Sequence, residues 1–297
     1  MGADWLSAVY RAIQSEHWRS RYRQFDETPI DYLEPGSGQA QTGYLWASNI
    51  PGGTVIYQWR AGRDVGGIVE LFGSSGPAAC TIQCDGYEAY PAWARNNPHI
   101  VLAGCHAHLR RKFFEVQEQD PKLVAWILRQ IGHLYGIERL LREAKAGPAL
   151  REAVRAPQGR MIQWRLKALI DRLALRAILP KSKLGKAIHY AARQWSKLEV
   201  YLGDGQIEID NNLVENAIRP TKLGAKNWLF IGCREAGKRA AILYTIVENC
   251  RRLGLGTREY LEDVLTRLPA MMESEVVTLT PANWLRARQG KQIWKAA

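Results

Sequence analysis

The sequence TGYLWASNIPGGTVIYQWR, residues 42–60, decides the fold class. It holds two short runs of β-branched and aromatic residues around a Pro-Gly turn signal, which is the pattern of two neighbouring strands. Two more runs of this kind follow, CTIQC at residues 80–84 and IVLA at residues 100–103. An aromatic-rich extended stretch also precedes Asp26. The first third of the chain therefore predicts five strands.

Helical patterns lie before and between these strands. Residues 1–22 place apolar side chains at helical spacing, residues 64–72 predict a helix capped by Asp64, and residues 87–96 predict another. Three successive strands followed by helix, strand, helix and strand predict an α/β fold. We expect a mixed five-stranded sheet with helices on both faces.

The pattern is helical almost throughout from residue 110 to about residue 201, and no strand signal interrupts it. A further helical stretch covers residues 211–268. Gly and Pro predict where helices end in these stretches. The predicted breaks are at Gly147-Pro148, residues 157–159, Leu179-Pro180, Gly224, Gly232 and residues 254–256. The sequence thus predicts an all-α insertion between the sheet and a last group of helices.

The charge of the chain favours an anionic partner. It contains 41 Lys and Arg against 29 Asp and Glu, a formal net charge of +12. DNA is the usual partner of such a surface, because each neutralised phosphate releases condensed counterions. We find no apolar run of membrane length and no leader pattern, so we predict a soluble, cytoplasmic protein without a membrane partner. Five cysteines without a secretion signal indicate a reducing compartment.

Three carboxylates suggest one kind of chemistry when they are taken together. Asp26 follows the first extended stretch, Asp85 follows the CTIQC run, and Glu215 lies in the helical sequence IDNNLVENAIRP. Taken singly, each has a purely structural interpretation. Asp is common in turns, and Glu215 could form an ion pair with Arg219, four residues further along the helix. Together they could bind two hard cations that activate a nucleophile and stabilise the leaving oxygen in phosphoryl transfer.

Seven motifs in order give the sequence its resemblance to a known family. They are FDETP (25–29), TGYLWA (42–47), CDGYEAY (84–90), GCHAHLRRKF (104–113), LPKSKLGKAIHYA (179–191), EIDNNLVENAIRP (208–220) and GAKNWLFIG (224–232). The chain resembles the insertion sequence 66 family of bacterial transposases. The resemblance implies an RNase H-like fold and DNA cleavage and strand transfer. It also implies an Asp-Asp-Glu triad of Asp26, Asp85 and Glu215 that holds two Mg²⁺ or Mn²⁺ ions.

The resemblance also implies a division of the chain. We expect an N-terminal helix at residues 1–22 and the first part of an RNase H-like core at 23–114. An all-α insertion would follow at 115–205, the second part of the core with the Glu215 helix at 206–270, and a C-terminal tail at 271–297.

Further residues are candidates for supporting roles. Cys105 and His108 form a C-x-x-H step after the last predicted strand, where similar transposases have such a signature; without a second pair of ligands we expect them to brace the site rather than bind zinc. Asn211, Asn212 and Arg219 flank Glu215 and could position a phosphate, or could cap and pair the helix. The candidates for contact with the DNA backbone are Arg110, Arg111, Lys112, Lys222 and Lys226.

The start of the chain differs from the family pattern. Similar transposases carry a long N-terminal region ahead of the catalytic core, whereas Asp26 lies close to Met1 here. We therefore expect that this region is missing and that transposon-end recognition needs partners. The expected partners are transposon ends and target DNA, a second copy of the chain, and accessory transposition proteins.

Two other functions fit the same residues. An inactive or truncated transposase would keep the basic surface and bind DNA without using its acids. A structure-selective nuclease of the same fold would cut DNA without joining a 3′-hydroxyl to a target.

Overall fold

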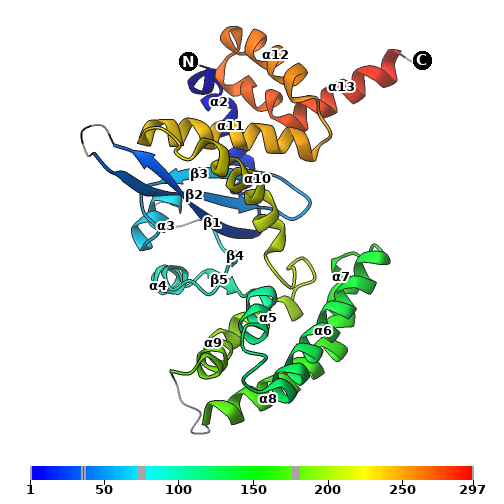
Figure 1. Ribbon diagram of the computed structural model, residues 1–297. Coiled ribbons are helices and arrows are strands. Elements are labelled where there is room, and N and C mark those ends of the chain that lie inside the picture. The colour runs from blue at the N-terminus through cyan, green and yellow to red at the C-terminus, as the bar shows by residue number, and fades with distance from the viewer. Residues whose placement is uncertain (1, 35, 37, 73–77, 176–180, 296–297) are drawn as a thin grey trace. The chain divides into compact units, whose positions relative to one another are not determined.

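The computed structural model describes residues 2–34, 36, 38–72, 78–175 and 181–295 (Figure 1). Five strands form one sheet in the order β3-β2-β1-β4-β5. They are β1 (Tyr22–Leu33), β2 (Ala40–Asn49), β3 (Val55–Arg60), β4 (Cys80–Gln83) and β5 (Ile100–Ala103). β1, β2 and β3 pair antiparallel, whereas the neighbours β4 and β5 are joined through helix α4 (Ala89–Ala94), the kind of crossover that parallel strands need. The predicted mixed α/β sheet is confirmed.

The register of the antiparallel strands aligns side chains in rows across the sheet. Asp26 on β1 pairs with Ala47 on β2, which pairs with Tyr57 on β3. Side chains alternate between the two faces of a strand, so Asp26 shares its face with Ile30 and Tyr32. Those two residues belong to an apolar cluster that also contains Ala47 and Tyr57.

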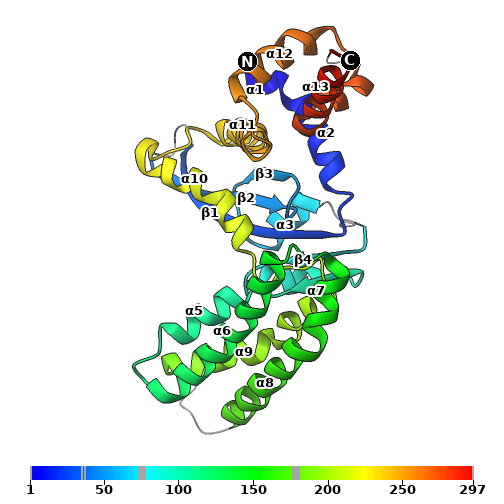
Figure 2. The same cartoon turned by 90° about the vertical axis from the view of Figure 1, so that its right-hand side faces the viewer.

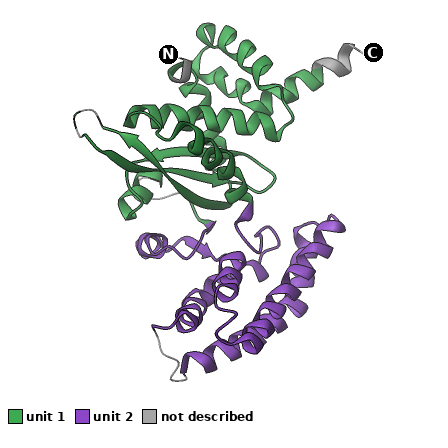
Figure 3. Cartoon of the chain, viewed as in Figure 1, with its two compact units in different colours: residues 1–80, 213–297 green, residues 81–212 purple. Residues whose placement is uncertain are grey.

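The chain forms two compact units, which Figure 3 shows in two colours. The first consists of residues 1–80 and 213–297, and the second of residues 81–212.

Helices cover both faces of the strands in the first unit (Figure 1). α10 (Asn212–Trp228) and α11 (Arg234–Arg252) lie on the face that carries Ile30 and Tyr32. α3 (Val65–Phe72) lies on the other face, where the rings of Phe72 and Phe25 are 5.1 Å apart. Asp64 Oδ1 accepts a hydrogen bond of 3.0 Å from the Gly67 amide, which confirms the predicted cap of α3.

The segment after α10 attaches to the end of β1. The amide of Ile231 donates to the carbonyl of Asp31 at 2.9 Å, and the amide of Leu33 donates to the carbonyl of Gly232 at 2.6 Å. Phe230 forms a parallel bridge with Asp31. The carboxyl end of α10 is therefore fixed to the strand that carries Asp26.

The two ends of the chain pack together in the first unit. The elements are α1 (Gly2–Trp5), α2 (Ser7–His17), α12 (Thr257–Arg267), η3 (Leu268–Ala270), η4 (Glu273–Leu279) and α13 (Pro281–Lys295). Val9 and Ile13 of α2 share a core cluster with Leu279 and Trp284. The described part of segment 271–297, expected as a tail, thus contributes to the core.

The second unit consists mainly of helices (Figure 2). Its helices after β5 are α5 (His106–Phe114), α6 (Pro121–Glu143), α7 (Pro148–Val154), η1 (Arg155–Gly159), α8 (Arg160–Leu175), α9 (Lys183–Leu198) and η2 (Val200–Leu202). Between residues 115 and 205 every element that the structure describes is helical, as predicted. In the described part of the chain, we find no helix with the length and apolar character to span a membrane.

A buried ion pair joins the helices of the second unit to the segment after α9. Arg155 and Glu138 are each 1% exposed, and Arg155 donates to both Glu138 carboxylate oxygens, at 2.7 and 2.8 Å. Arg155 Nη1 also donates to the carbonyls of Tyr201, Asp204 and Ile207, at 2.9 to 3.1 Å. The guanidinium thus connects η1 and α6 with residues 201–207.

Two predicted helix breaks are wrong, three are confirmed, and the break at Leu179-Pro180 lies outside the described residues. α10 continues through Gly224, where a Cβ atom would lie 2.8 Å from Trp228 Nε1, so the glycine makes room for the indole one turn later. At Pro157 the chain forms a π-helical turn between α7 and α8, a wider turn that keeps the helix going. The breaks at Gly147-Pro148, Gly232 and residues 254–256 lie between helices as predicted.

Candidate functional site

Asp26 lies half-buried in the middle of β1. The Asp26 side chain lies on the same face of β1 as Ile30 and Tyr32, because an even number of residues separates it from each. That face of the sheet is covered by α10 and α11. The neighbouring acid, Glu27, lies on the opposite face, where it pairs with Arg63 at 2.5 Å. Of these two adjacent carboxylates, only Asp26 is on the α10 side.

The row that contains Asp26 runs across the sheet to α10. Tyr57, at the far end of this row, donates its hydroxyl to the carbonyl of Ala217 at 2.6 Å. Burial raises the pKa of Tyr57, so the hydroxyl stays protonated and available as a donor. Ala217 lies two residues after Glu215, which connects the Asp26 row to the start of the helix that carries Glu215.

Glu215 lies in the first turn of α10 at the edge of its buried stripe. Val214, Ala217 and Ile218 form that stripe, and Glu215 itself is half-buried. Lys222, two turns further on the same flank, donates to the carbonyl of Pro29 on β1 at 3.2 Å. The first unit therefore brings Asp26 and Glu215 to one face of the sheet, with the Glu215 flank of α10 linked to β1.

Asp85 lies two residues beyond the end of β4 and is half-buried. Its Oδ1 accepts a hydrogen bond of 2.9 Å from the amide of Tyr87, which holds the side chain in a tight turn. Asp85 belongs to the second unit, whereas Asp26 and Glu215 belong to the first.

The three acids suit hard cations by their chemistry. All are carboxylates, the oxygen ligands that Mg²⁺ and Mn²⁺ prefer, and none is sealed in the core. Among the residues with described positions, no cluster of three or more His, Cys, Asp or Glu has the arrangement to hold a metal.

The residues before Glu215 fix the start of α10. Asp210 Oδ1 accepts from the amide of Asn212 at 3.1 Å, and Asp210 Oδ2 accepts from the Asn212 side chain at 3.0 Å. Tyr135 of α6 donates its hydroxyl to Asp210 Oδ2 at 2.7 Å. Asn211 is fully buried. Asp210 is therefore the residue whose side chain accepts from the first turn, while Asn212 is exposed at the surface.

The C-x-x-H step begins α5. Cys105 is buried at the residue before the helix, and His108 is half-buried. His106, which no sequence motif marked as a candidate, is fully buried. Its Nδ1 lies 3.1 Å from the carbonyl of Ile209, and its Nε2 lies 2.6 Å from Gln163 Nε2. The signal for this burial was the helical spacing of His106 with Leu109 and Phe113.

His106 should make the second unit sensitive to acid. Burial lowers the pKa of His106 to about 4, below the ordinary value of 6.5, although the hydrogen bond to Ile209 opposes the shift. A His with a lowered folded-state pKa contributes stability above pH 6.5 that is lost as the pH falls toward 4. Because the unfolded state takes up this proton first, we expect the free energy of unfolding to fall by about 2–3 kcal/mol as the pH falls over that range.

Urea denaturation of wild type and His106→Gln across this pH range tests the expectation. The variant should be less stable near neutral pH, but its stability should fall less on acidification. His189→Gln, at an exposed position, is the matched control and should keep the wild-type pH dependence. Parallel pH curves for wild type and His106→Gln would contradict the assignment.

The basic candidates lie at the surface. Arg110, Arg111 and Lys112 are exposed on α5 in the second unit. On α10, Arg219, Lys222 and Lys226 are exposed. They continue the Glu215 flank at steps of three and four residues, so a row of cations extends along the helix from this carboxylate.

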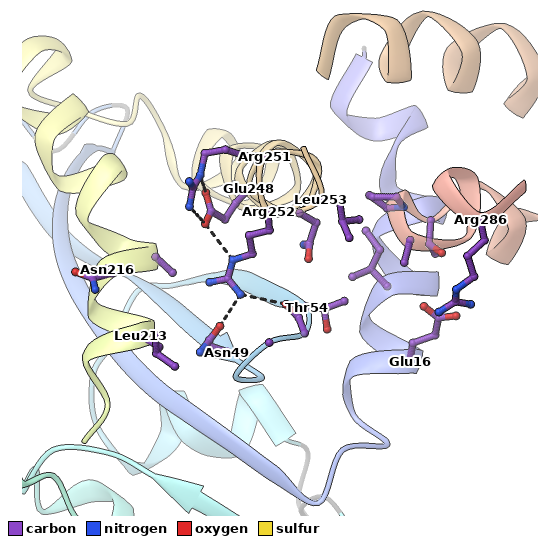
Figure 4. A pocket seen from close by; sticks show the side chains of 18 residues that line it. Glu16, Asn49, Thr54, Leu213, Asn216, Glu248, Arg251, Arg252, Leu253 and Arg286 are labelled. Atoms are coloured by element: carbon purple, nitrogen blue, oxygen red, sulfur yellow. Dashed lines mark hydrogen bonds and ion pairs between the residues drawn. The ribbon is translucent and has the colours of Figure 1, made fainter. Parts of the chain in front are cut away.

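A cavity of about 650 Å³ opens on the other flank of α10, at Leu213 and Asn216 (Figure 4). Arg252 of α11 donates to Asn49 Oδ1 at 2.6 Å and to Glu248 Oε1 at 3.1 Å. Glu248 also binds Arg251 at 2.7 Å. Burial alone would raise the pKa of Glu248, but these two arginines lower it. The Glu248 carboxylate is thus engaged by two arginines of its own helix. The sequence did not predict this cavity.

Comparisons with known proteins agree with the motifs. The sequence profile described as "Transposase IS66 family" matches residues 1–239. The uncharacterized protein y4qI of Sinorhizobium fredii (strain NBRC 101917 / NGR234) is 35% identical over 276 residues, which are 87% of this chain and 50% of that protein. The uncharacterized protein y4jD of the same strain is 30% identical over 310 residues, 97% of this chain and 58% of that protein. The chain thus spans between half and three fifths of these relatives.

Proposed function

Because the chain belongs to the IS66 transposase family, we propose that it is the catalytic part of a DNA transposase that cuts DNA and joins a 3′-hydroxyl to a target. The observation that carries the proposal is the family match over residues 1–239, which includes Asp26, Asp85 and Glu215. The surface chemistry supports it, since exposed cations continue from Glu215 along α10.

The sheet supports an RNase H-like fold. Three antiparallel strands are followed by two strands reached through helices, in the order β3-β2-β1-β4-β5. The two Asp residues lie on β1 and just after β4, and the Glu lies on a helix after the helical segment. This is the order of acids that the family resemblance implies.

The roles of the residues follow from their positions. Asp26, Asp85 and Glu215 would hold two Mg²⁺ or Mn²⁺ ions, which supply activation of the attacking hydroxyl or water and stabilise the leaving oxygen. Arg219, Lys222 and Lys226 would bind backbone phosphates and so position the strand. On α5, Arg110, Arg111 and Lys112 offer a second set of phosphate contacts. Transposon ends, target DNA, a second copy and accessory proteins are the proposed partners.

A strand-transfer assay tests the proposal. The protein is incubated with labelled DNA that carries pre-cleaved candidate ends of its element, together with a circular target and Mg²⁺. We expect joined products with Mg²⁺ and none with EDTA. Cleavage of branched DNA without any joining would identify a nuclease instead. Binding without either reaction, at any divalent ion tested, would favour a DNA-binding protein that does not use its acids.

A further inference from the structure

A groove with two tryptophans lies between α6 and α8 of the second unit. Its volume is about 410 Å³, within the range of small-ligand sites. Trp126 comes from α6, and Trp164, Arg165 and Arg172 come from α8. None of the described residues that line the groove is acidic.

Helix geometry forms the groove on α8. Trp164, Ala168 and Arg172 follow one another at four-residue steps and so lie along one face. Ala168, between Trp164 and Arg172 on that face, also lines the groove. Trp164 is 68% exposed, an unusual position for so large an aromatic side chain, and such exposed apolar surface commonly marks a site of interaction.

The arginines of the groove are available to a ligand. Lys167, on the same helix, pairs with Asp171 at 2.6 Å. Arg165 and Arg172 take part in no ion pair with any residue that the structure describes. Two unengaged guanidinium groups beside two indole rings complement a ligand that is both anionic and aromatic.

We propose that this groove binds unpaired nucleotides of DNA, with a base stacked on Trp164 and the adjoining phosphates at Arg165 and Arg172. Indole faces stack on any base, and guanidinium groups bind phosphate in a bidentate manner. The inference rests on DNA as the partner in the proposed function, but it requires no cleavage. Charge complementarity favours this occupant over an apolar surface of a second copy, which would leave both guanidinium groups desolvated without acceptors.

The experiment compares two labelled oligonucleotides of equal length and charge. One is oligothymidine, and the other is an abasic strand with the same phosphates but without bases. Fluorescence anisotropy gives the affinity of the full chain for each, with EDTA present so that no cleavage occurs. We expect wild type to prefer oligothymidine by about tenfold, the effect of stacking one base. Trp164→Ala should lose that preference, and Trp164→Phe should retain most of it.

The charge contribution has its own matched control. Arg165→Ala and Arg172→Ala should weaken binding to both strands, whereas Arg160→Ala, which removes an exposed charge outside the groove, should change it by less than about twofold. Because Trp164 is exposed, its replacement should leave the circular dichroism spectrum unchanged.

Several results would overturn the groove assignment. One is equal affinity of wild type for the two strands. Another is an unchanged base preference in Trp164→Ala. A third is that Trp164→Ala changes the oligomeric state, measured by sedimentation, without changing the affinity for either strand. If wild type shows the Trp164-dependent preference but no strand transfer, the groove assignment holds and the proposed function is contradicted. If it shows strand transfer without that preference, the proposed function holds and the groove assignment is contradicted.

Discussion

Glu215→Gln should abolish Mg²⁺-dependent DNA cleavage and leave DNA binding intact. The amide nearly preserves the shape of the side chain but removes an anionic oxygen ligand from the proposed metal site. Asp26→Asn and Asp85→Asn should have the same effect. We expect each single variant to lose at least ~10³-fold in cleavage rate, the scale seen when one member of a catalytic unit is removed.

Two further results would distinguish a shared site from three separate effects. Double variants should be hardly slower than single ones, because one missing ligand already disables the unit. Mn²⁺ should partly restore a single variant, whereas Ca²⁺ should support binding with little cleavage, since it accepts looser geometry than Mg²⁺.

The control for this series is Glu235→Gln, the same chemical change at an exposed glutamate of α11 that pairs with Lys238. It should cleave at the wild-type rate. If wild type cleaves and Glu215→Gln retains its full rate, the catalytic assignment of Glu215 is wrong, and a structural role at the start of α10 is the better explanation.

Arg155→Met should cause the largest loss of stability among single substitutions in the second unit, about 3–5 kcal/mol. It leaves the Glu138 carboxylate buried with Arg151, at 3.4 Å, as its one remaining ion-pair partner among the residues that the structure describes. It also removes the donor to three backbone carbonyls of residues 201–207. Urea denaturation followed by circular dichroism measures the loss.

A double variant separates the ion pair from the carbonyl contacts. Glu138→Met with Arg155→Met removes both charges, so it should recover part of the lost stability. The recovery should be incomplete, because the carbonyls of Tyr201, Asp204 and Ile207 still lack their donor. Arg160→Met, at an exposed position, should cost less than about 0.5 kcal/mol. Equal losses for Arg155→Met and Arg160→Met would show that the buried pair contributes nothing.

The strands were predictable because their side chains follow a local rule. The runs at residues 42–60 are bounded by turn residues. Asp64 caps its helix by accepting a hydrogen bond from Gly67, only three residues further along the chain. Such signals lie within one element. Gly224 and the Pro157 turn were misjudged because tertiary packing around Trp228 and a wider helical turn override the usual effect of Gly and Pro.

Buried polar groups were beyond sequence reasoning. Arg155 reads as a surface residue, and only its partners on distant segments explain its burial. The burial of His106 was not predictable from the C-x-x-H motif of Cys105 and His108, because its partners Ile209 and Gln163 lie far along the chain. Motifs located the acids, but the row from Asp26 to Tyr57 and Ala217 depends on strand register, which the sequence does not specify.

The attachment of α10 has a consequence for ligand affinity. The helix is connected to the strands through Tyr57, through Lys222 and through the backbone pairing of residues 230–232 with the end of β1. A carboxylate on such a helix has lost its backbone freedom during folding. When a ligand arrives, only the rotamers of the Glu215 side chain remain to be ordered, so the entropy lost on binding is small. Loosening any of these attachments should therefore weaken binding of the proposed metal ions without removing a single ligand atom.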